Sequence, residues 1–209
     1  MLKLITTLAL FVATVVSGQT SFEKDMSKAI HFWNEGKSSE ALTALDKITM
    51  NEKENWLPYY YIALIHTVDA YESSADKTKM KTSLELAQKA QDKANALALE
   101  NPEVLIVQAM IHTAWIVYNP MINGQKLSGD VLYILNKAHK IAPENPRVVF
   151  QKADFEKGMA AYFGQDTAAM CAEFEKAIKL FTTFKPETQL HPNWGLDRAE
   201  EALKECKIN

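Results

Sequence analysis

Glu100-Asn101-Pro102 is the centre of a pattern that recurs along this chain, earlier as Glu54-Asn55 and later as Glu144-Asn145-Pro146. The offsets are 46 residues (100 − 54) and 44 residues (144 − 100). The 46-residue offset also places Ala63-Leu64-Ile65-His66-Thr67 on Ala109-Met110-Ile111-His112-Thr113. A period of this length, filled with apolar residues at helical spacing, predicts stacked helical hairpins. Such proteins bind other molecules along an extended surface more often than they catalyse reactions.

The apolar periodicity predicts four helical hairpins and one further helix. The hairpins begin near Phe22, Trp56, Asn101-Pro102 and Asn145-Pro146. Asparagine is a good N-cap and proline suits a first helical turn, so the last two starts are well marked. A final amphipathic helix from Leu196 to about Cys206 would cap the stack. The expected fold is all-α, an α–α superhelix formed by one domain over residues 19–209.

The first hairpin resembles a tetratricopeptide repeat. Ala29 and Phe32 match the small and aromatic positions of a first helix, and Gly36 matches the turn. Ala41 and Leu45 match the small-then-large pair of the second helix. The resemblance extends in degenerate form over most of the chain after residue 18. It implies a scaffold for protein interactions whose first helices line a concave groove.

The end of the chain carries a second resemblance. Phe184-Lys185-Pro186, His191-Pro192-Asn193-Trp194-Gly195 and Cys206 are similar to the corresponding positions of exported tetratricopeptide-like proteins of the Bacteroidetes type. This likeness implies an exported helical-repeat protein and says nothing of a ligand. From its residue type, Trp194 is expected to anchor this segment by packing.

The first 18 residues have the layout of a secretory signal peptide. Met1-Leu2-Lys3 is a short positive start, Leu4 to Val16 is an apolar run, and Ser17-Gly18 supplies small residues before the cleavage point. The run of 13 residues is short for a membrane span, and no cysteine stands near for lipid attachment. We therefore expect a periplasmic or secreted protein with no membrane span after cleavage. An uncleaved anchoring helix is the alternative.

Composition and motifs narrow the function classes. A net charge of −3 and a pI near 6.0 give no sign of the basic surface that nucleic-acid binding uses. The chain has no His-Glu-x-x-His, Gly-x-Ser-x-Gly, phosphate-cradling glycine loop or Cys-x-x-Cys. We expect neither an enzyme nor a bound cofactor.

A polar stripe on the first helices of the second and third hairpins is the leading candidate site. Its histidines are equivalent under the 46-residue offset, and its other members share their face at helical spacing. The stripe consists of His66, Asp69, Gln108, His112 and Trp115, with Tyr61 and Met121 expected beside it. The main interpretation is a groove for a protein or peptide partner. The alternatives are a small-ligand or metal site that uses both histidines, and half-buried packing residues.

The segment from Tyr118 to Asp130 contains one proline and two glycines, which predicts a long loop between helices. Long loops in compact folds are often functional, so Met121, Ile122 and Leu127 would cover a groove or another subunit. The alternative is a loop whose apolar residues fold back onto their own hairpin.

Cys171 and Cys206 are the two cysteines of the chain. An exported protein meets oxidising conditions, so an even count permits one disulfide between neighbouring helices. Two buried free thiols are the alternative.

Overall fold

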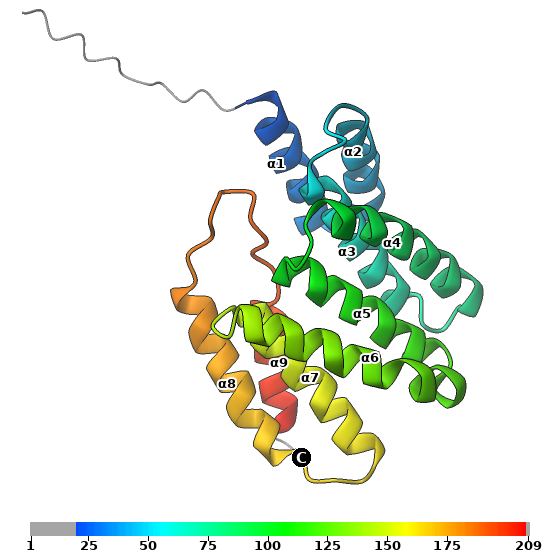
Figure 1. Ribbon diagram of the computed structural model, residues 1–209, viewed down its shortest axis with the longest axis vertical. Coiled ribbons are helices and arrows are strands. Elements are labelled where there is room, and N and C mark those ends of the chain that lie inside the picture. The colour runs from blue at the N-terminus through cyan, green and yellow to red at the C-terminus, as the bar shows by residue number, and fades with distance from the viewer. Residues whose placement is uncertain (1–19, 208–209) are drawn as a thin grey trace, which may run out of the picture.

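The structure is a computed structural model that describes residues 20–207 (Figure 1). The predicted signal peptide, residues 1–18, lies outside these residues. The described residues form nine helices and no strand: α1 (Ser21–Asn34), α2 (Ser38–Asn51), α3 (Trp56–Glu72), α4 (Lys77–Leu97), α5 (Pro102–Tyr118), α6 (Pro120–Ile141), α7 (Pro146–Tyr162), α8 (Ala168–Thr183) and α9 (Leu196–Cys206). Among residues 20–207, no helix has the length and apolarity that crossing a membrane requires.

Each helix packs against the next one along the chain, and the first helices α3, α5 and α7 also pack on one another. The arrangement is an all-α superhelix of four hairpins, with α1 and α2 at one end and α7, α8 and α9 at the other (Figure 1). This confirms the fold class and the capping helix predicted from the periodicity. The largest cluster of buried apolar side chains is built around α3, with further members from α1, α2, α4 and α5.

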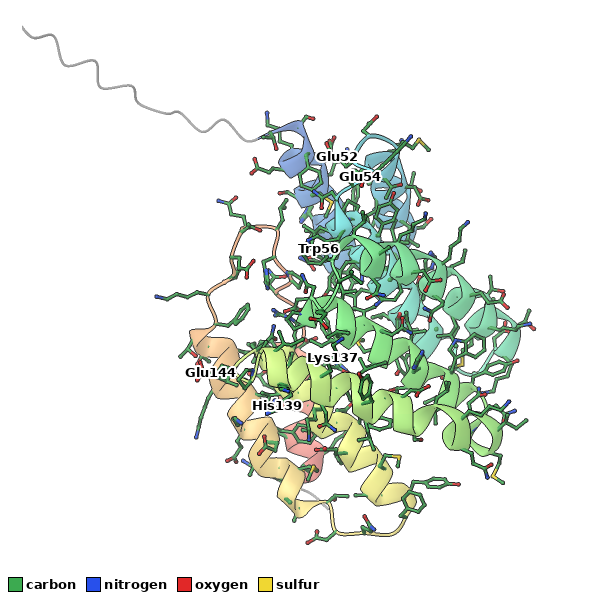
Figure 2. The ribbon with its side chains drawn as sticks, in the orientation of Figure 1. Glu52, Glu54, Trp56, Lys137, His139 and Glu144 are labelled. Atoms are coloured by element: carbon green, nitrogen blue, oxygen red, sulfur yellow. A yellow bond between two sulfur atoms is a disulfide. The ribbon has the colours of Figure 1, made fainter. Side chains whose placement is uncertain are left out.

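The recurring asparagines begin the first helices of three hairpins. The side-chain oxygens of Asn55, Asn101 and Asn145 accept hydrogen bonds from the backbone N–H groups two residues on, at 3.1, 2.9 and 3.0 Å. Each bond satisfies a donor that the first helical turn leaves free. Figure 2 labels Glu54 and Glu144, which precede two of these caps in the turns before α3 and α7. The repeated pattern thus marks structurally equivalent helix starts.

The predicted loop over 118–130 is wrong, because all but one of its residues are helical. Asn119 alone connects α5 to α6, and its side chain caps α6 by accepting a bond from the Ile122 N–H at 3.3 Å. Proline occupies the first turn, where its missing N–H costs nothing. Gly124 and Gly129 lie inside the helix and each cost about 1 kcal/mol relative to alanine. Packing farther along α6 offsets that cost, since Val131 and Leu135 are buried.

An irregular segment over 184–195, here called the strap, connects α8 to α9. It leaves the end of α8, loops toward α1 and returns to α9 (Figure 1). A disulfide joins Cys171 on α8 to Cys206 at the end of α9, with a Cα–Cα distance of 5.7 Å. It therefore closes a covalent loop that contains the whole strap.

Reduction of the disulfide is expected to lower the free energy of unfolding by about 2–4 kcal/mol, because the unfolded chain regains the freedom that the cross-link removes. Urea denaturation with and without reductant measures the change. The Cys171→Ser/Cys206→Ser double variant should match the reduced protein and ignore reductant. Equal unfolding midpoints for the oxidised and reduced wild-type chain would contradict the expectation.

Candidate functional site

The predicted stripe faces the layer of second helices. Gln108 and Gln88 of α4 exchange side-chain hydrogen bonds, both 3.0 Å long. On α5 the stripe therefore faces α4, and the side-chain amide of Gln108 is already hydrogen-bonded to that of Gln88. Trp115 on the same face is half-buried and meets Tyr118 edge-to-face, with ring centroids 5.4 Å apart.

The two histidines of the stripe have different surroundings. Burial lowers the pKa of His66, and the carboxylates of Asp69 and of Asp46 on α2 oppose that shift. Burial also lowers the pKa of His112, and Asp130 on α6 opposes it. Two of these carboxylates lie outside the stripe. Asp46 belongs to α2 and Asp130 belongs to α6. The described residues contain no group of three or more His, Cys, Asp and Glu placed to hold a metal ion.

The other predicted residues lie elsewhere. Tyr61 is buried beneath the strap, where its hydroxyl donates to the Leu190 carbonyl at 3.4 Å. Asp69 lines a polar hollow of about 390 Å³ beside the α3–α4 connection. Met121 is 73% exposed near the start of α6. Gln108, His112 and Trp115 therefore share one face of α5 at helical spacing, while Tyr61 lies beneath the strap, and the binding roles of all seven residues stay predictions.

A buried ion pair joins the third and fourth hairpins. Arg147, at the start of α7, donates from Nε and Nη2 to the two carboxylate oxygens of Glu103 on α5, at 2.8 and 2.7 Å. Both side chains are essentially inaccessible to solvent. The Asn145 side chain donates to the same carboxylate at 2.6 Å while its own oxygen caps α7. A fork-to-fork pair of this kind fixes orientation as well as distance.

The carboxylate of Glu103 stays ionised in this setting. Burial would raise its pKa, but His191 and Arg147 beside it outweigh that effect and hold the pKa below the ordinary value. The imidazole Nε2 of His191 lies 3.6 Å from the carboxylate. Glu103 also occupies the first turn of α5, where the helix dipole favours negative charge.

The strap packs over this ion pair. The Phe184 ring centroid lies 4.8 Å from the guanidinium carbon of Arg147, a cation–π contact. The Trp194 indole donates to the Tyr60 hydroxyl at 2.7 Å, which agrees with the expected packing role of this tryptophan. Gly195 has φ +106°, and an added Cβ would come within 3.2 Å of the Phe181 ring, so only glycine suits the start of α9.

Sequence reasoning missed this pair, although the repeat held the signal. Glu103 and Arg147 stand 44 residues apart (147 − 103), the same offset as the asparagine caps, and each follows its cap by two residues. Opposite charges at equivalent positions of adjacent first helices predict contact. The equivalent position of the second hairpin is Leu57, which is buried.

An exposed apolar surface lies where the third and fourth hairpins reverse direction. Here called the tip surface, it consists of Val117, Met121, Ile122, Tyr162 and Phe163, which are between 42% and 73% exposed. Ile116 of α5 and Met159 of α7 pack against the same buried cluster, so the last turns of these helices are neighbours. The tip surface therefore takes its residues from two hairpins that pack on each other.

The tip surface offers flat rings and two metal-binding atoms, the Tyr162 oxygen and the Met121 sulfur. Tyr162 and Phe163 meet edge-to-face, with centroids 5.2 Å apart. Lys126 lies one turn beyond Ile122 on α6 and is exposed. A cluster of exposed apolar side chains often marks an interaction site. This surface suits a flat apolar ligand with an anionic edge.

Comparison with known proteins gives one informative result. No family model matches the chain, and no curated protein sequence matches it significantly. Among solved structures, it is similar to the HusA haemophore from Porphyromonas gingivalis, with a TM-score of 0.78 and 22% identity. The match covers 91% of this chain and 96% of the haemophore. The likeness establishes a shared helical fold, and the tetratricopeptide resemblance stays a prediction.

Arg147→Met is expected to lower the free energy of unfolding by about 3–5 kcal/mol, because it leaves the Glu103 carboxylate buried without its partner. The double variant Glu103→Leu/Arg147→Met should lose less than Arg147→Met alone, since it removes both charges. Arg198→Met is the matched control, because Arg198 pairs with Glu201 on the exposed face of α9. Urea denaturation measures all three, and a loss in the double variant equal to or larger than that of Arg147→Met alone would contradict coupling.

Stability should fall as the pH drops below about 6.5, because the unfolded chain then binds protons that the folded His66 and His112 resist. Their contribution is complete above the unfolded pKa and is lost as pH falls toward the lowered folded values. His66→Gln/His112→Gln should flatten the change in urea midpoint between about pH 7.5 and about pH 5.5. His31→Gln, at an exposed position of α1, is the control. An unchanged slope in the double variant would refute the assignment.

Proposed function

We propose that this protein is an exported, non-catalytic carrier that binds haem or a similar flat porphyrin on its tip surface. The observation that carries the proposal is the exposed, edge-to-face Tyr162–Phe163 pair at the end of α7, with Met121 and Ile122 exposed at the start of the neighbouring helix α6. The structural likeness to a haemophore, a protein named for binding haem, supports the same ligand class. It favours the small-ligand alternative over a concave groove for a peptide.

The residues of the tip surface fit the chemistry of haem. Its apolar side chains would cover the porphyrin faces, and the exposed ammonium group of Lys126 would meet a propionate. A tyrosine oxygen is an established axial ligand of haem iron, which gives Tyr162 a role. The porphyrin supplies four nitrogens of its own, so the site needs no cluster of three or four protein ligands.

Export is part of the proposal. The first 18 residues have the layout of a signal peptide, and a structural disulfide suits an oxidising compartment. A protein partner on the polar stripe is the second candidate, favoured by the half-exposed side chains that remain there. It ranks lower because Gln108 is already paired with Gln88.

Titration of the protein with hemin, followed by visible absorption, tests the proposal. Tyr162→Phe keeps the ring and removes the iron ligand, so it should weaken binding by at least about tenfold, equivalent to 1.4 kcal/mol, and alter the spectrum. Tyr133→Phe is the matched control, because Tyr133 is 69% exposed and lies farther along α6, away from the tip surface.

Two results would count against the proposal. Absence of saturable hemin binding by the wild-type chain would reject the ligand. Equal hemin affinity and identical spectra for Tyr162→Phe and Tyr133→Phe would reject the tip surface as its location.

A further inference from the structure

A second surface lies at the opposite end of the superhelix. The first hairpin carries a hollow of about 430 Å³ between α1 and α2. Its apolar floor comes from Phe22, Phe32, Ala44 and Ile48. None of the residues that line it is a histidine, cysteine, methionine or tyrosine, so it offers no usual ligand for haem iron.

The hollow faces away from the core of the protein. Met26 and Ala29 of α1 are fully buried, and Trp33 meets Tyr61 of α3 at a ring distance of 6.0 Å. Asp25 and Lys28, which line the hollow, lie on the other side of α1 at helical spacing. In the described part of the chain, no helix packs on this outer side.

The other end of the superhelix shows what covers such a hairpin. There α9 packs on α7 and α8, and Ala199 and Ala202 join the buried cluster that contains Phe150 and Phe174. A solenoid exposes an apolar face at an uncapped end. The hollow extends along α1 from Ser21 to Phe32, a length of about 16 Å, which suits a helix of about three turns, as in the 11-residue α9.

Charges around the hollow restrict its occupant. Asp25, Glu40 and Glu52 line it together with two lysines, which leaves a net charge of −1. Lys28 sits over the Phe32 ring, 5.6 Å from the centroid. An incoming helix with an apolar stripe and basic flanks would pair its charges with Asp25, Glu40 and Glu52 and its apolar side chains with Phe22 and Phe32.

We propose that the α1–α2 hollow is a docking site for a short basic amphipathic helix of a partner protein. The partner helix takes the capping position that α9 fills at the other end, with its apolar residues at i, i+3, i+4 and i+7. This interaction is independent of the tip surface, so a carrier can hold its ligand while a partner occupies its far end.

The test uses the full chain and labelled 14-residue peptides. One peptide has leucines at i, i+3, i+4 and i+7 with lysines on the flanks. A second has the same composition in scrambled order, and a third has glutamates in place of the lysines. Thr43→Arg places bulk and positive charge in the hollow. Thr82→Arg is its matched control, because both threonines are exposed and donate to the carbonyl four residues back.

Fluorescence anisotropy should show saturable binding of the first peptide alone. Thr43→Arg should weaken that binding by at least about tenfold and Thr82→Arg should leave it unchanged, with both variants folded by circular dichroism. Equal binding of the scrambled peptide, or equal binding by Thr43→Arg, would overturn the proposal. A wild-type dimer that Thr43→Arg dissociates would overturn it too, because a second copy would then be the occupant.

Discussion

The ion pair between Glu103 and Arg147 is the constraint on which the C-terminal half of the superhelix depends. Two buried charges are tolerated only when nearly every polar atom around them is bonded. Here the guanidinium and Asn145 donate to the carboxylate and the Phe184 ring packs on the guanidinium, whereas Arg147 Nη1 has no hydrogen-bond partner among the described residues. We infer that this requirement sets the register of α7 against α5 and the position of the strap, because few other arrangements would satisfy the same atoms.

Much of the fold could be predicted because helix starts are local features. The asparagine caps and the prolines behind them act within one turn, and α5, α7 and α9 begin where the sequence indicates. The segment after Tyr118 shows the limit of that reasoning. Proline and glycine there resemble a loop locally, yet the buried side chains of Val131 and Leu135 hold α6 as a helix. Tertiary packing therefore decides that this segment is helical, and the packing partners of a helix cannot be read from one sequence.

The candidate site was harder to predict than the fold. Equivalence under the repeat assigned His66 and His112 to matching first helices, α3 and α5, but periodicity does not reveal which layer their side chains meet. The Gln88–Gln108 pair shows that the stripe on α5 meets the second helices. The tip surface combines residues from separate hairpins, and only the packing of α6 on α7 makes those hairpins neighbours. The Glu103–Arg147 pair was accessible in principle, because its offset equals that of the caps.

The position of the strap inside the disulfide loop has a consequence for proteolysis. Residues 185–189 are exposed and irregular, which makes them the natural target for a protease. A cut there would leave α9 tethered to α8 through Cys171 and Cys206. The nicked chain would keep its capping helix, and buried Leu190 and half-buried Trp194 would remain attached to the fragment that α9 anchors. The cross-link therefore lets the molecule tolerate a break at its most vulnerable segment.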